Sequence, residues 1–545
     1  MPYPRWSVDN PQWATVGSAD KYSMSSALSA SSTQKRPVQE PELARNADPD
    51  SGQRAGDRSG RRIWTAEIFL VGVFLVALTT RVLVLAHPAD VYLGPAILFD
   101  HLGLRIAVGQ GFGPSSILPP LYPFYLSCFY KMIGYSHEVV LFSHALLGAL
   151  ACSAGALLVR YLGLNRRYAW MAGLLLALFP QSLAQARHLS PETLISYLFL
   201  VGIVLWTRGK PFPHYGESLG AGLVFGLVLL GGLGAILPIG CALLVRAHFE
   251  DRMTGTFGPF QTETGPGGHP SGSLQVAPTK PDSPGRLFGI RVGHLALVLF
   301  CLFAIAGAWS NRNSDLHGRA VLVDSTWALR LRAATIPGLN EIEYRVPGRL
   351  VEQPDNSPLT ENAIALGEWM GFVATYPVKA LKIWSDRAES FFGFSGRNDV
   401  TTLERFPYAG AFYQIAQAMV WGVALSLALA WVILLRRRGG QERVLASAVL
   451  GCIALGCVSG NVGTARIFTV PLIVALAMRG SWGVLVLSGI RLRTARSEAR
   501  MLANGERIGV ELLPRGVDRA GRLRWLAWIF AVLAVWIHGL SSLIE

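Results

Sequence analysis

Residues 90–123 read DVYLGPAILFDHLGLRIAVGQGFGPSSILPPLYP and directly follow a long apolar run at residues 63–86. This stretch is too polar and too rich in glycine and proline to span a bilayer, whereas the run before it is long enough to do so. It contains Asp90, Asp100, His101, a GQGFG turn at residues 109–113 and a PPLYP step at residues 119–123. We therefore predict that the stretch forms the mouth of an active site at a membrane surface, and that the rest of the chain is its membrane scaffold.

The apolar composition of the chain indicates a membrane protein. Of the 545 residues, 51% are hydrophobic and 15% are charged. The hydrophobic residues come in runs of roughly 17 to 25, and each such run can cross the hydrocarbon core as a helix. We predict an all-α polytopic membrane protein with about 11 transmembrane helices. Its first apolar run is expected to act as an uncleaved signal anchor.

The positive charge of the chain lies where membrane topology predicts it. The net charge is +14, and lysine and arginine crowd short segments at residues 160–167, 436–438 and 491–524. Such clusters mark cytoplasmic loops, whereas nucleic-acid binding would need a basic face on a soluble domain. We therefore expect no nucleic-acid partner, a multi-pass location in the plasma (inner) membrane, and a cytoplasmic N-terminus.

The cysteines do not predict a metal site. The six cysteines are Cys128, Cys152, Cys241, Cys301, Cys452 and Cys457. All of them lie in apolar segments without metal-ligand spacing, which is typical of small core residues in helices. We predict no cofactor and no metal site, and the sequence leaves a requirement for a divalent metal open.

The alternation of polar and apolar segments predicts the domain organisation. We expect a disordered cytoplasmic tail at residues 1–62, because it lacks a periodic apolar pattern. The predicted parts that follow are a membrane core at 63–309 with an outer loop at 87–137 and a cytoplasmic loop at 248–288, a small extracytoplasmic mixed domain at 310–410, membrane helices at 411–490, a basic cytoplasmic loop at 491–522, and a last transmembrane helix with the C-terminus at 523–545.

Several apolar segments within the core are predicted to be short or broken. Residues 95–108 suit a short interfacial helix, and residues 120–134 suit a re-entrant segment because prolines break its start. Helices are also predicted at 168–184, 191–206 and 290–309. Residues 217–247 are interrupted by Gly231, Gly232 and Gly234, and we predict two short helices folded back on each other.

This topology brings a set of polar side chains to the outer face. They are Asp90, Asp100, His101, Arg187, His188, Glu192, Arg312 and Arg466. Arginines can hold phosphate oxygens bidentately, and a carboxylate can take a proton from an acceptor hydroxyl. The set therefore suits a reaction on a lipid phosphate.

Each of these side chains also has a purely structural interpretation. Ser190, Pro191 and Glu192 form a good helix start, so Glu192 could be only a cap. Arg466 could anchor a helix end in the headgroups. Asp90 could be a solvated loop residue, whereas Asp100 lies among apolar neighbours and is harder to explain in this way.

Seven stretches, taken in order, resemble the GT-C-type membrane glycosyltransferases, which include the protein O-mannosyltransferases (family 39) and the lipid A aminoarabinose transferases. They are FDHLGLRIAVGQGFG (99–113), PPLYPFYLSCFYKMIG (119–134), HLSPETL (188–194), WSNRN (309–313), GRAVLVDSTWALRL (318–331), TYPVKALKIWSDRAESFFGF (375–394) and GNVGTARIFTVPLIVAL (460–476). The resemblance covers about residues 63–490. It departs from the family where the main acid is expected, because Pro95 and Ala96 stand there.

The resemblance implies a fold, an activity and a site. It implies a GT-C-like fold and an inverting transfer of a sugar from a polyprenyl-phosphate donor to a lipid, glycan or protein acceptor on the outer face. An outer-loop carboxylate, Asp90 or Asp100, would be the general base. The implied substrate-binding residues are Arg466, Glu192, His188, Arg312 and Tyr122.

Two other functions stay open at this stage. A transporter or flippase of lipid-linked sugars would carry ionisable residues buried within the membrane, and Arg81 is the one clear case in the first four helices. A non-catalytic membrane scaffold derived from the same fold would explain the departure at the acid position. If substitution of neither Asp90 nor Asp100 changes the function, the scaffold is favoured.

Overall fold

The computed structural model describes most of the apolar segments of the chain. The described residues are 50–86, 96–113, 118–208, 214–249, 284–318, 321, 323, 331, 335, 358–392, 407–434, 440–459, 462–487 and 519–544. The chain divides into two compact units, Met1–Arg62 and Ile63–Glu545. The architecture below is that of the second unit.

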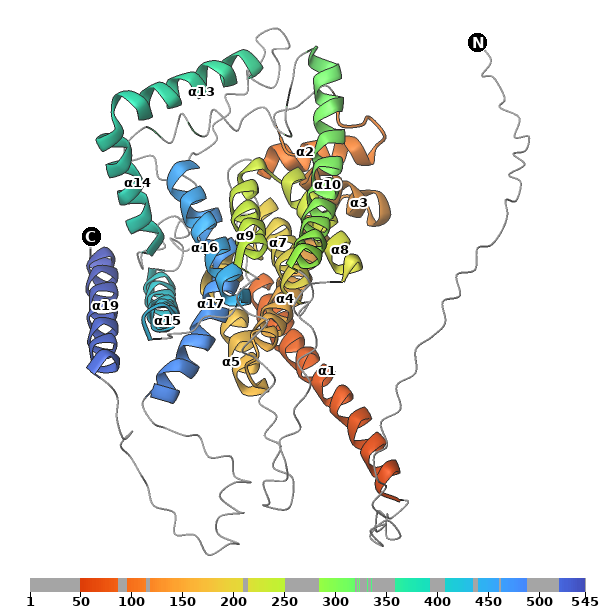
Figure 1. Cartoon of the computed structure of the whole chain (residues 1–545). Helices are drawn as coiled ribbons and strands as arrows, with labels where there is room; N and C mark the ends of the chain where they lie inside the picture. The colour runs from red at the N-terminus through yellow and green to blue at the C-terminus, as the bar shows by residue number, and fades with distance from the viewer. Residues whose placement is uncertain are drawn as a thin grey trace, which may run out of the picture. The chain divides into compact units, whose positions relative to one another are not determined.

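Helices make up the regular structure of the described residues (Figure 1). They are α1 (Asp50–Leu85), α2 (Ala96–Ala107), α3 (Leu121–Ile133), α4 (His137–Tyr161), α5 (Arg166–Ala177), α6 (Pro180–Gln185), α7 (Pro191–Arg208), α8 (Tyr215–Leu230), the 3₁₀ turn η2 (Leu233–Ala235), α9 (Ile236–Phe249), α10 (Pro284–His317), α13 (Pro358–Thr375), α14 (Pro377–Phe392), α15 (Pro407–Leu434), α16 (Gly440–Ser459), α17 (Val462–Leu487) and α19 (Arg519–Ile544).

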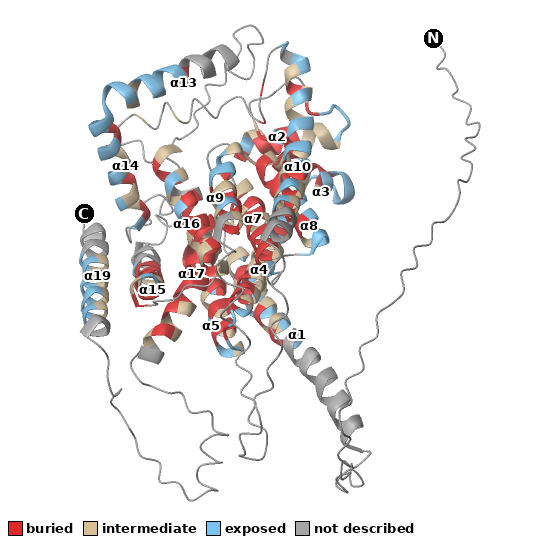
Figure 2. Cartoon of the chain, in the orientation of Figure 1, coloured by how far each residue is buried: buried red, intermediate tan, exposed pale blue. Residues whose placement is uncertain are grey.

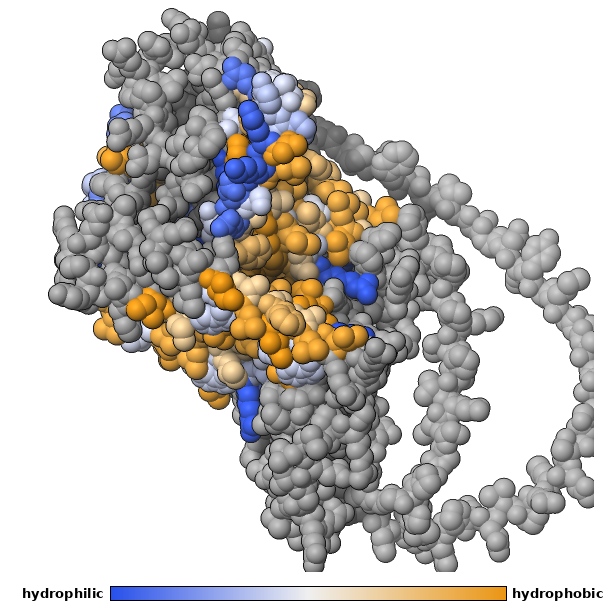
Figure 3. Space-filling model, turned by 90° about the vertical axis from the view of Figure 1, so that its left-hand side faces the viewer, coloured by the Kyte–Doolittle hydropathy of each residue, from blue (hydrophilic) through white to orange (hydrophobic). Residues whose placement is uncertain are grey.

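Six of the described helices are long and apolar enough to cross a membrane. The candidate spans are Ile68–Leu85, His137–Tyr161, Val292–Leu316, Ile415–Leu434, Gly440–Ser459 and Ala465–Val484. Three shorter apolar segments are Tyr215–Leu230, Leu233–Ala247 and Leu523–Ile537. Apolar residues cover much of the described surface in Figure 3. By length and composition the chain is an α-helical membrane protein, and the figure of about 11 spans stays a prediction.

Local sequence signals explain where many helices begin. Six helices, α6, α7, α10, α13, α14 and α15, each start at a proline, whose fixed φ and missing N–H suit the first helical position. The side chain of Ser136 accepts a hydrogen bond from the Val139 N–H at the start of α4, and Asn165 accepts from the Arg167 and Tyr168 N–H groups at the start of α5. These caps satisfy backbone donors that the first turn leaves open.

Several predicted helix bounds need correction. α1 begins at Asp50, inside the tail that we predicted to be disordered, and α10 runs from Pro284 to His317, beyond the predicted 290–309. The predicted helix at 168–184 is two helices, because α5 ends at Ala177 and α6 starts at Pro180. A proline disfavours helical backbone in the residue before it, and Phe179 accordingly has ψ 115°.

The glycine-broken segment also differs from the prediction. Residues 217–247 do form two short helices, α8 and α9, separated by Gly231 and Gly232. However, α8 packs mainly against α7 and α10, and α9 packs mainly against α16. The break therefore sends each helix to different neighbours instead of folding the pair on itself.

Helix α17 lies among the most buried helices of the described unit. It packs against α15, α16, α4, α5 and α7, and Figure 2 shows that buried residues concentrate in these helices. Two glycines allow close helix contacts here: Gly480 of α17 faces the Leu427 carbonyl of α15, and Gly451 of α16 faces Pro238 of α9. Small residues at such crossings let membrane helices approach closely.

The region predicted as an extracytoplasmic mixed domain is described only in part. The strand-like stretch at 318–331 lies mostly outside the described residues. Helices α13 and α14 are described, and α14 packs against α16 and α17. Arg387 of α14, which is 2% exposed, donates a hydrogen bond of 2.9 Å to the Cys457 carbonyl of α16. This part of the region is therefore fastened to the membrane helices.

Candidate functional site

The two short helices of the predicted outer loop form a packed pair. α2 and α3 contact each other and bury Phe99, Tyr122, Leu126 and Tyr130. Gly103 lets the helices approach, because a Cβ there would lie 2.7 Å from the Leu126 Cβ. α3 has 13 residues, too few to span a bilayer at about 1.5 Å per residue. The predicted short helix and short non-spanning segment are both present.

Asp100 is buried in this pair and accepts three hydrogen bonds. The Tyr130 hydroxyl donates to Oδ1, and the Tyr135 hydroxyl donates to Oδ2 at 2.7 Å. His137 Nε2 lies 3.2 Å from Oδ2, and it must donate, because an ionised carboxylate only accepts. The neighbouring His101 is exposed. Asp100 thus joins α2, α3 and the start of α4, and both of its oxygens are engaged.

A hydrogen-bonded chain joins Tyr122, His144 and the loop before α7. The Tyr122 hydroxyl lies 3.2 Å from His144 Nε2, and His144 Nδ1 lies 3.2 Å from the carbonyl oxygen of His188. The carbonyl can only accept, so Nδ1 carries the proton. In the neutral imidazole Nε2 then accepts from the tyrosine. Tyr122 and His188, two predicted site residues, are therefore brought together by the buried His144 of α4.

Two carboxylates, those of Asp100 and Glu192, lie near enough to Tyr122 to affect the pKa of its phenol. Burial raises the pKa of its phenol well above the ordinary value, and nearby Tyr125, Tyr130, Glu192 and Asp100 raise it further. The neutral phenol is thus retained, which keeps Tyr122 as a donor. The structure places the predicted acids Asp100 and Glu192 within electrostatic reach of this hydroxyl.

Glu192 lies in the first turn of α7, where an acid favours the positive end of the helix dipole. The Ser190 hydroxyl donates to Glu192 Oε2. The cap interpretation fits this position, and the closeness to Tyr122 fits a binding role, so both stay open for Glu192.

Arg312 joins the WSNRN segment to the GQGFG turn. Its Nη2 donates to the Gly113 carbonyl at 2.5 Å, although the two residues are 199 positions apart. Its guanidinium carbon lies 4.5 Å from the ring centre of Trp309 and 5.3 Å from that of Phe112. Cation–π contacts of this kind hold an arginine in place. Arg312 therefore connects the turn after α2 to α10.

Arg466 lies elsewhere, in α17. It is 4% exposed, and its guanidinium carbon lies 5.0 Å from the ring centre of Trp421 in α15. A headgroup anchor would keep its charge in contact with the interface, so this burial favours an internal role for Arg466. Asp90, the other predicted base, lies outside the described residues.

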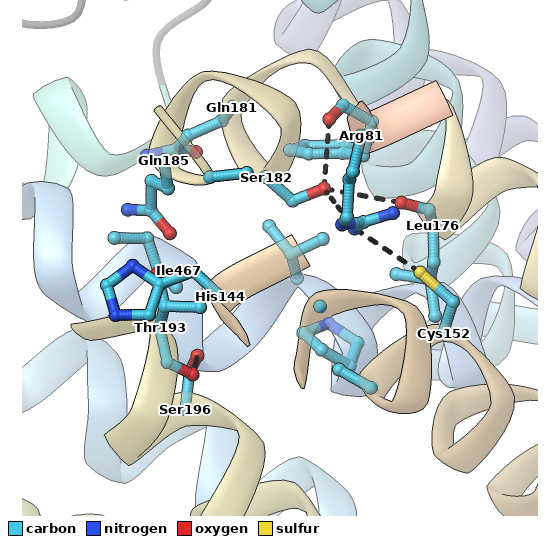
Figure 4. A pocket seen from close by; sticks show the side chains of 16 residues that line it. Arg81, His144, Cys152, Leu176, Gln181, Ser182, Gln185, Thr193, Ser196 and Ile467 are labelled. Carbon is cyan, nitrogen blue, oxygen red and sulfur yellow. Dashed lines mark hydrogen bonds between the residues drawn. The ribbon is translucent and has the colours of Figure 1, made fainter. Parts of the chain in front are cut away.

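A hollow among the helices was missed by the sequence reasoning (Figure 4). It contains about 590 Å³ of atom-free space, which includes some open solvent. The lining comes from α1, α4, α5, α6, α7 and α17 and is mostly apolar. Its polar members are Arg81, His144, Gln181, Ser182, Gln185, Thr193 and Ser196. His144 thus touches both the tyrosine chain and this hollow.

Arg81 was the one sequence signal for the hollow. It is the only charged residue in the span Ile68–Leu85, and ionisable residues inside membrane helices are commonly functional. The other polar lining residues gave no such signal, because glutamine, serine and threonine are ordinary at helix ends and turns. The described residues hold no group of three or more His, Cys, Asp or Glu side chains that could bind a metal ion.

Comparison with known proteins gives no family assignment. No model of a known protein family matches the chain. The chain is 30% identical over 139 residues to a protein of Aquifex aeolicus (strain VF5) described as uncharacterized. The match covers 24% of this chain and 28% of the relative, so the chain spans under a third of that protein's length. This likeness carries no activity to the present chain.

Proposed function

We propose that the protein is a polytopic membrane glycosyltransferase of GT-C type that transfers a sugar from a polyprenyl-phosphate donor to an acceptor at the outer face of the membrane. The observation that carries the proposal is the meeting of distant stretches around α2 and α3. Arg312 contacts Gly113 of the GQGFG turn, and Tyr122 of PPLYP reaches His188 of HLSPETL through His144. Stretches up to 199 residues apart in sequence thus contact each other.

In this proposal the reaction is a single displacement. An outer-loop carboxylate takes the proton of the acceptor hydroxyl, the acceptor oxygen attacks the sugar carbon, and the bond from that carbon to the lipid phosphate breaks with inversion. The engagement of both Asp100 oxygens by Tyr130, Tyr135 and His137 favours Asp90 as the base and Asp100 as the group that positions α2. Arginine would stabilise the departing phosphate, with Arg466 and Arg312 as the candidates.

Donor turnover in liposomes tests this proposal. Purified full-length protein would be reconstituted and offered radiolabelled polyprenyl-phosphate sugars, with wild type compared with Asp90→Asn and Asp100→Asn. Asp386→Asn, an exposed position on α14, is the matched control. We expect one donor to be consumed, Asp90→Asn to abolish consumption, and the control to match wild type. Lack of turnover of every donor, or equal turnover by all three variants, would refute the carboxylate mechanism.

The second candidate function is transport of a lipid-linked sugar. The observation that favours it is Arg81, a buried cation in a candidate span that lines the hollow between helices, because buried ionisable residues mark substrate pathways in membranes. A transporter would move the donor from one leaflet to the other without consuming it. The same vesicles distinguish the two functions if leaflet-selective extraction of the donor is measured beside its turnover.

A further inference from the structure

Arg81 carries a positive charge that the described structure does not neutralise. Its side chain is 1% exposed, and no carboxylate forms an ion pair with it among the described ion pairs. Its contacts are the Ala77 carbonyl at 3.1 Å, Ser182 Oγ at 3.3 Å and Cys152 Sγ at 3.4 Å. These neutral acceptors leave the charge itself uncompensated in an apolar surrounding, which is costly.

The Arg81 Nε–H also lacks an acceptor within the described protein. This atom is buried without a hydrogen-bond partner, and the residue lines the hollow. Gly148 of α4 leaves room for the guanidinium, because a Cβ at that position would lie 3.1 Å from Arg81 Cδ and closer still to Nε. The helix packing therefore accommodates a buried guanidinium with one donor still available.

Two more buried polar atoms at the same hollow lack a hydrogen-bond partner among the described residues. They are Gln181 Oε1 of α6 and Thr193 Oγ1 of α7, in side chains that are 3% and 8% exposed. Buried polar atoms in proteins are nearly always hydrogen-bonded, so each exception needs an explanation. Three exceptions from three different helices at one hollow have a common explanation in a polar ligand. Figure 4 shows Arg81 on one side of the hollow and Thr193 on the other.

The backbone of α17 adds an acceptor at this place. Pro471 lies inside α17, and both it and Ile467 line the hollow. Proline has no N–H, so the carbonyl four residues earlier, that of Ile467, loses its usual helical donor. The lining thus combines a cationic donor with hydroxyl and amide oxygens, and one of its residues, Ile467, has a carbonyl without its usual helical donor.

We infer that this hollow binds a phosphate group, with Arg81 on the phosphate oxygens and with Gln181, Thr193 and the Ile467 carbonyl on neighbouring hydroxyls. An uncompensated guanidinium selects an anion, and guanidinium geometry suits phosphate oxygens. The apolar remainder of the lining, which includes Phe179 and Val470, suits the hydrocarbon beside a lipid headgroup. The inference rests on the proposed function only for the statement that the phosphate belongs to the lipid-linked donor, and it gives the binding of that phosphate to Arg81 in place of Arg466 and Arg312. Free phosphate shares the headgroup chemistry.

Binding of a tritiated polyprenyl-phosphate hexose, whose sugar supplies the neighbouring hydroxyls, to the purified full-length chain tests the inference. The protein is kept in a maltoside detergent without phospholipid, so no other lipid phosphate competes. Unlabelled polyprenol and inorganic phosphate serve as competitors. We expect the polyprenyl-phosphate hexose to bind saturably, polyprenol not to compete, and inorganic phosphate to compete weakly. Equal competition by polyprenol would overturn the inference, because the anion would then contribute nothing.

Matched variants locate the binding. Arg81→Gln should weaken binding by roughly 30-fold or more, and Thr193→Val and Gln181→Leu by about 5- to 10-fold each. Thr207→Val is the control on the same helix, since Thr207 is fully buried and bonded to the Ile203 carbonyl away from the hollow. Gln417→Leu is the control for the glutamine, since Gln417 is buried in α15 and does not line the hollow. Both controls should bind as wild type does.

Thr193→Val keeps the test decisive if Arg81→Gln does not fold. Valine has nearly the shape of threonine, and the hydroxyl that it removes has no partner to lose. If the folded variants among Thr193→Val, Gln181→Leu and Arg81→Gln all bind with wild-type affinity, the inference is overturned. If inorganic phosphate binds as tightly as the lipid with the same dependence on Arg81, the phosphate site stands and its ligand is free phosphate.

The outcomes separate this site from the proposed activity. Binding that depends on Arg81, without turnover of any donor, keeps the phosphate site and refutes the glycosyltransferase. Turnover that is unchanged in Thr193→Val and Arg81→Gln keeps the glycosyltransferase and refutes the site as its donor pocket.

Discussion

Replacement of Gly451 by alanine tests whether α9 and α16 pack as closely as the structure shows. A Cβ on Gly451 would lie 2.6 Å from Pro238 Cα, 3.0 Å from Pro238 N and 3.1 Å from the Leu237 carbonyl oxygen. All three are backbone atoms, so no side chain can swing away. To reach an ordinary contact of 3.4 Å, the two helices must separate by about 0.8 Å, a shift of the kind that overpacked cores make.

The free energy of this change follows from two opposed terms. Overpacking costs about 1–3 kcal/mol, and a rigid backbone neighbour puts this site in the upper part of that range. Alanine in place of a helical glycine returns about 0.8–1 kcal/mol. The expected net destabilisation is therefore about 1–2 kcal/mol.

Gly240→Ala is the matched control, because Gly240 belongs to α9 itself and a Cβ there would meet nothing within 4 Å. That variant should be as stable as wild type or slightly more stable. The assay is thermal unfolding in detergent, followed by thiol-reactive fluorescence of cysteines such as the buried Cys452. A Gly451→Ala protein that unfolds at the temperature of the control would refute the close packing.

Three further changes probe other contacts. Asp100→Ala should destabilise the chain by about 1–3 kcal/mol, because the buried Tyr130 hydroxyl loses its acceptor; thermal unfolding measures this, and an unchanged midpoint would contradict the role of Asp100. Arg387→Gln should loosen α14 from α16 and speed maleimide labelling of Cys457, whose carbonyl Arg387 binds; an unchanged labelling rate would argue against this contact. Glu442→Gln should cost about 1–3 kcal/mol, because Arg479, whose side chain is 16% exposed, loses its ion-pair partner at 2.6 Å; the double variant Glu442→Gln, Arg479→Met should recover much of this loss, and no recovery would count against the pair.

The sequence was sufficient for the local architecture. Apolar runs predicted the helices, and the prolines before Tyr122 predicted a short α3. Each of these signals depends only on residues of the helix that it predicts or directly beside it. The break at Gly231 was also visible. The helices that pack against α8 and α9 were not predictable, since an apolar helix surface does not specify which helix will cover it. The break before Pro180 needed attention to a single residue inside a run that is otherwise apolar.

Charged residues predicted part of the candidate site, and the family resemblance added Tyr122. Asp100 stood out by its charge, but its donors Tyr130, Tyr135 and His137 did not, because tyrosine is common near membrane surfaces. The hollow depends on Arg81, Gln181 and Thr193 from three helices, and sequence spacing says nothing of such a meeting. Only the isolated charge of Arg81 gave a hint, and by itself that charge favours the transporter.

Pro471 has a mechanical consequence for the wall of the hollow. Sharp bends in long helices occur at prolines, where the ladder of backbone hydrogen bonds is interrupted. In α17 this joint lies at the level of the hollow, while the rest of the helix packs against α15 and α16. A change of angle at this one joint would widen or narrow the hollow, and it would also shift one arm of α17 against the helices on which that arm packs. The width of the hollow would thus be coupled to the packing of α17 against its neighbours.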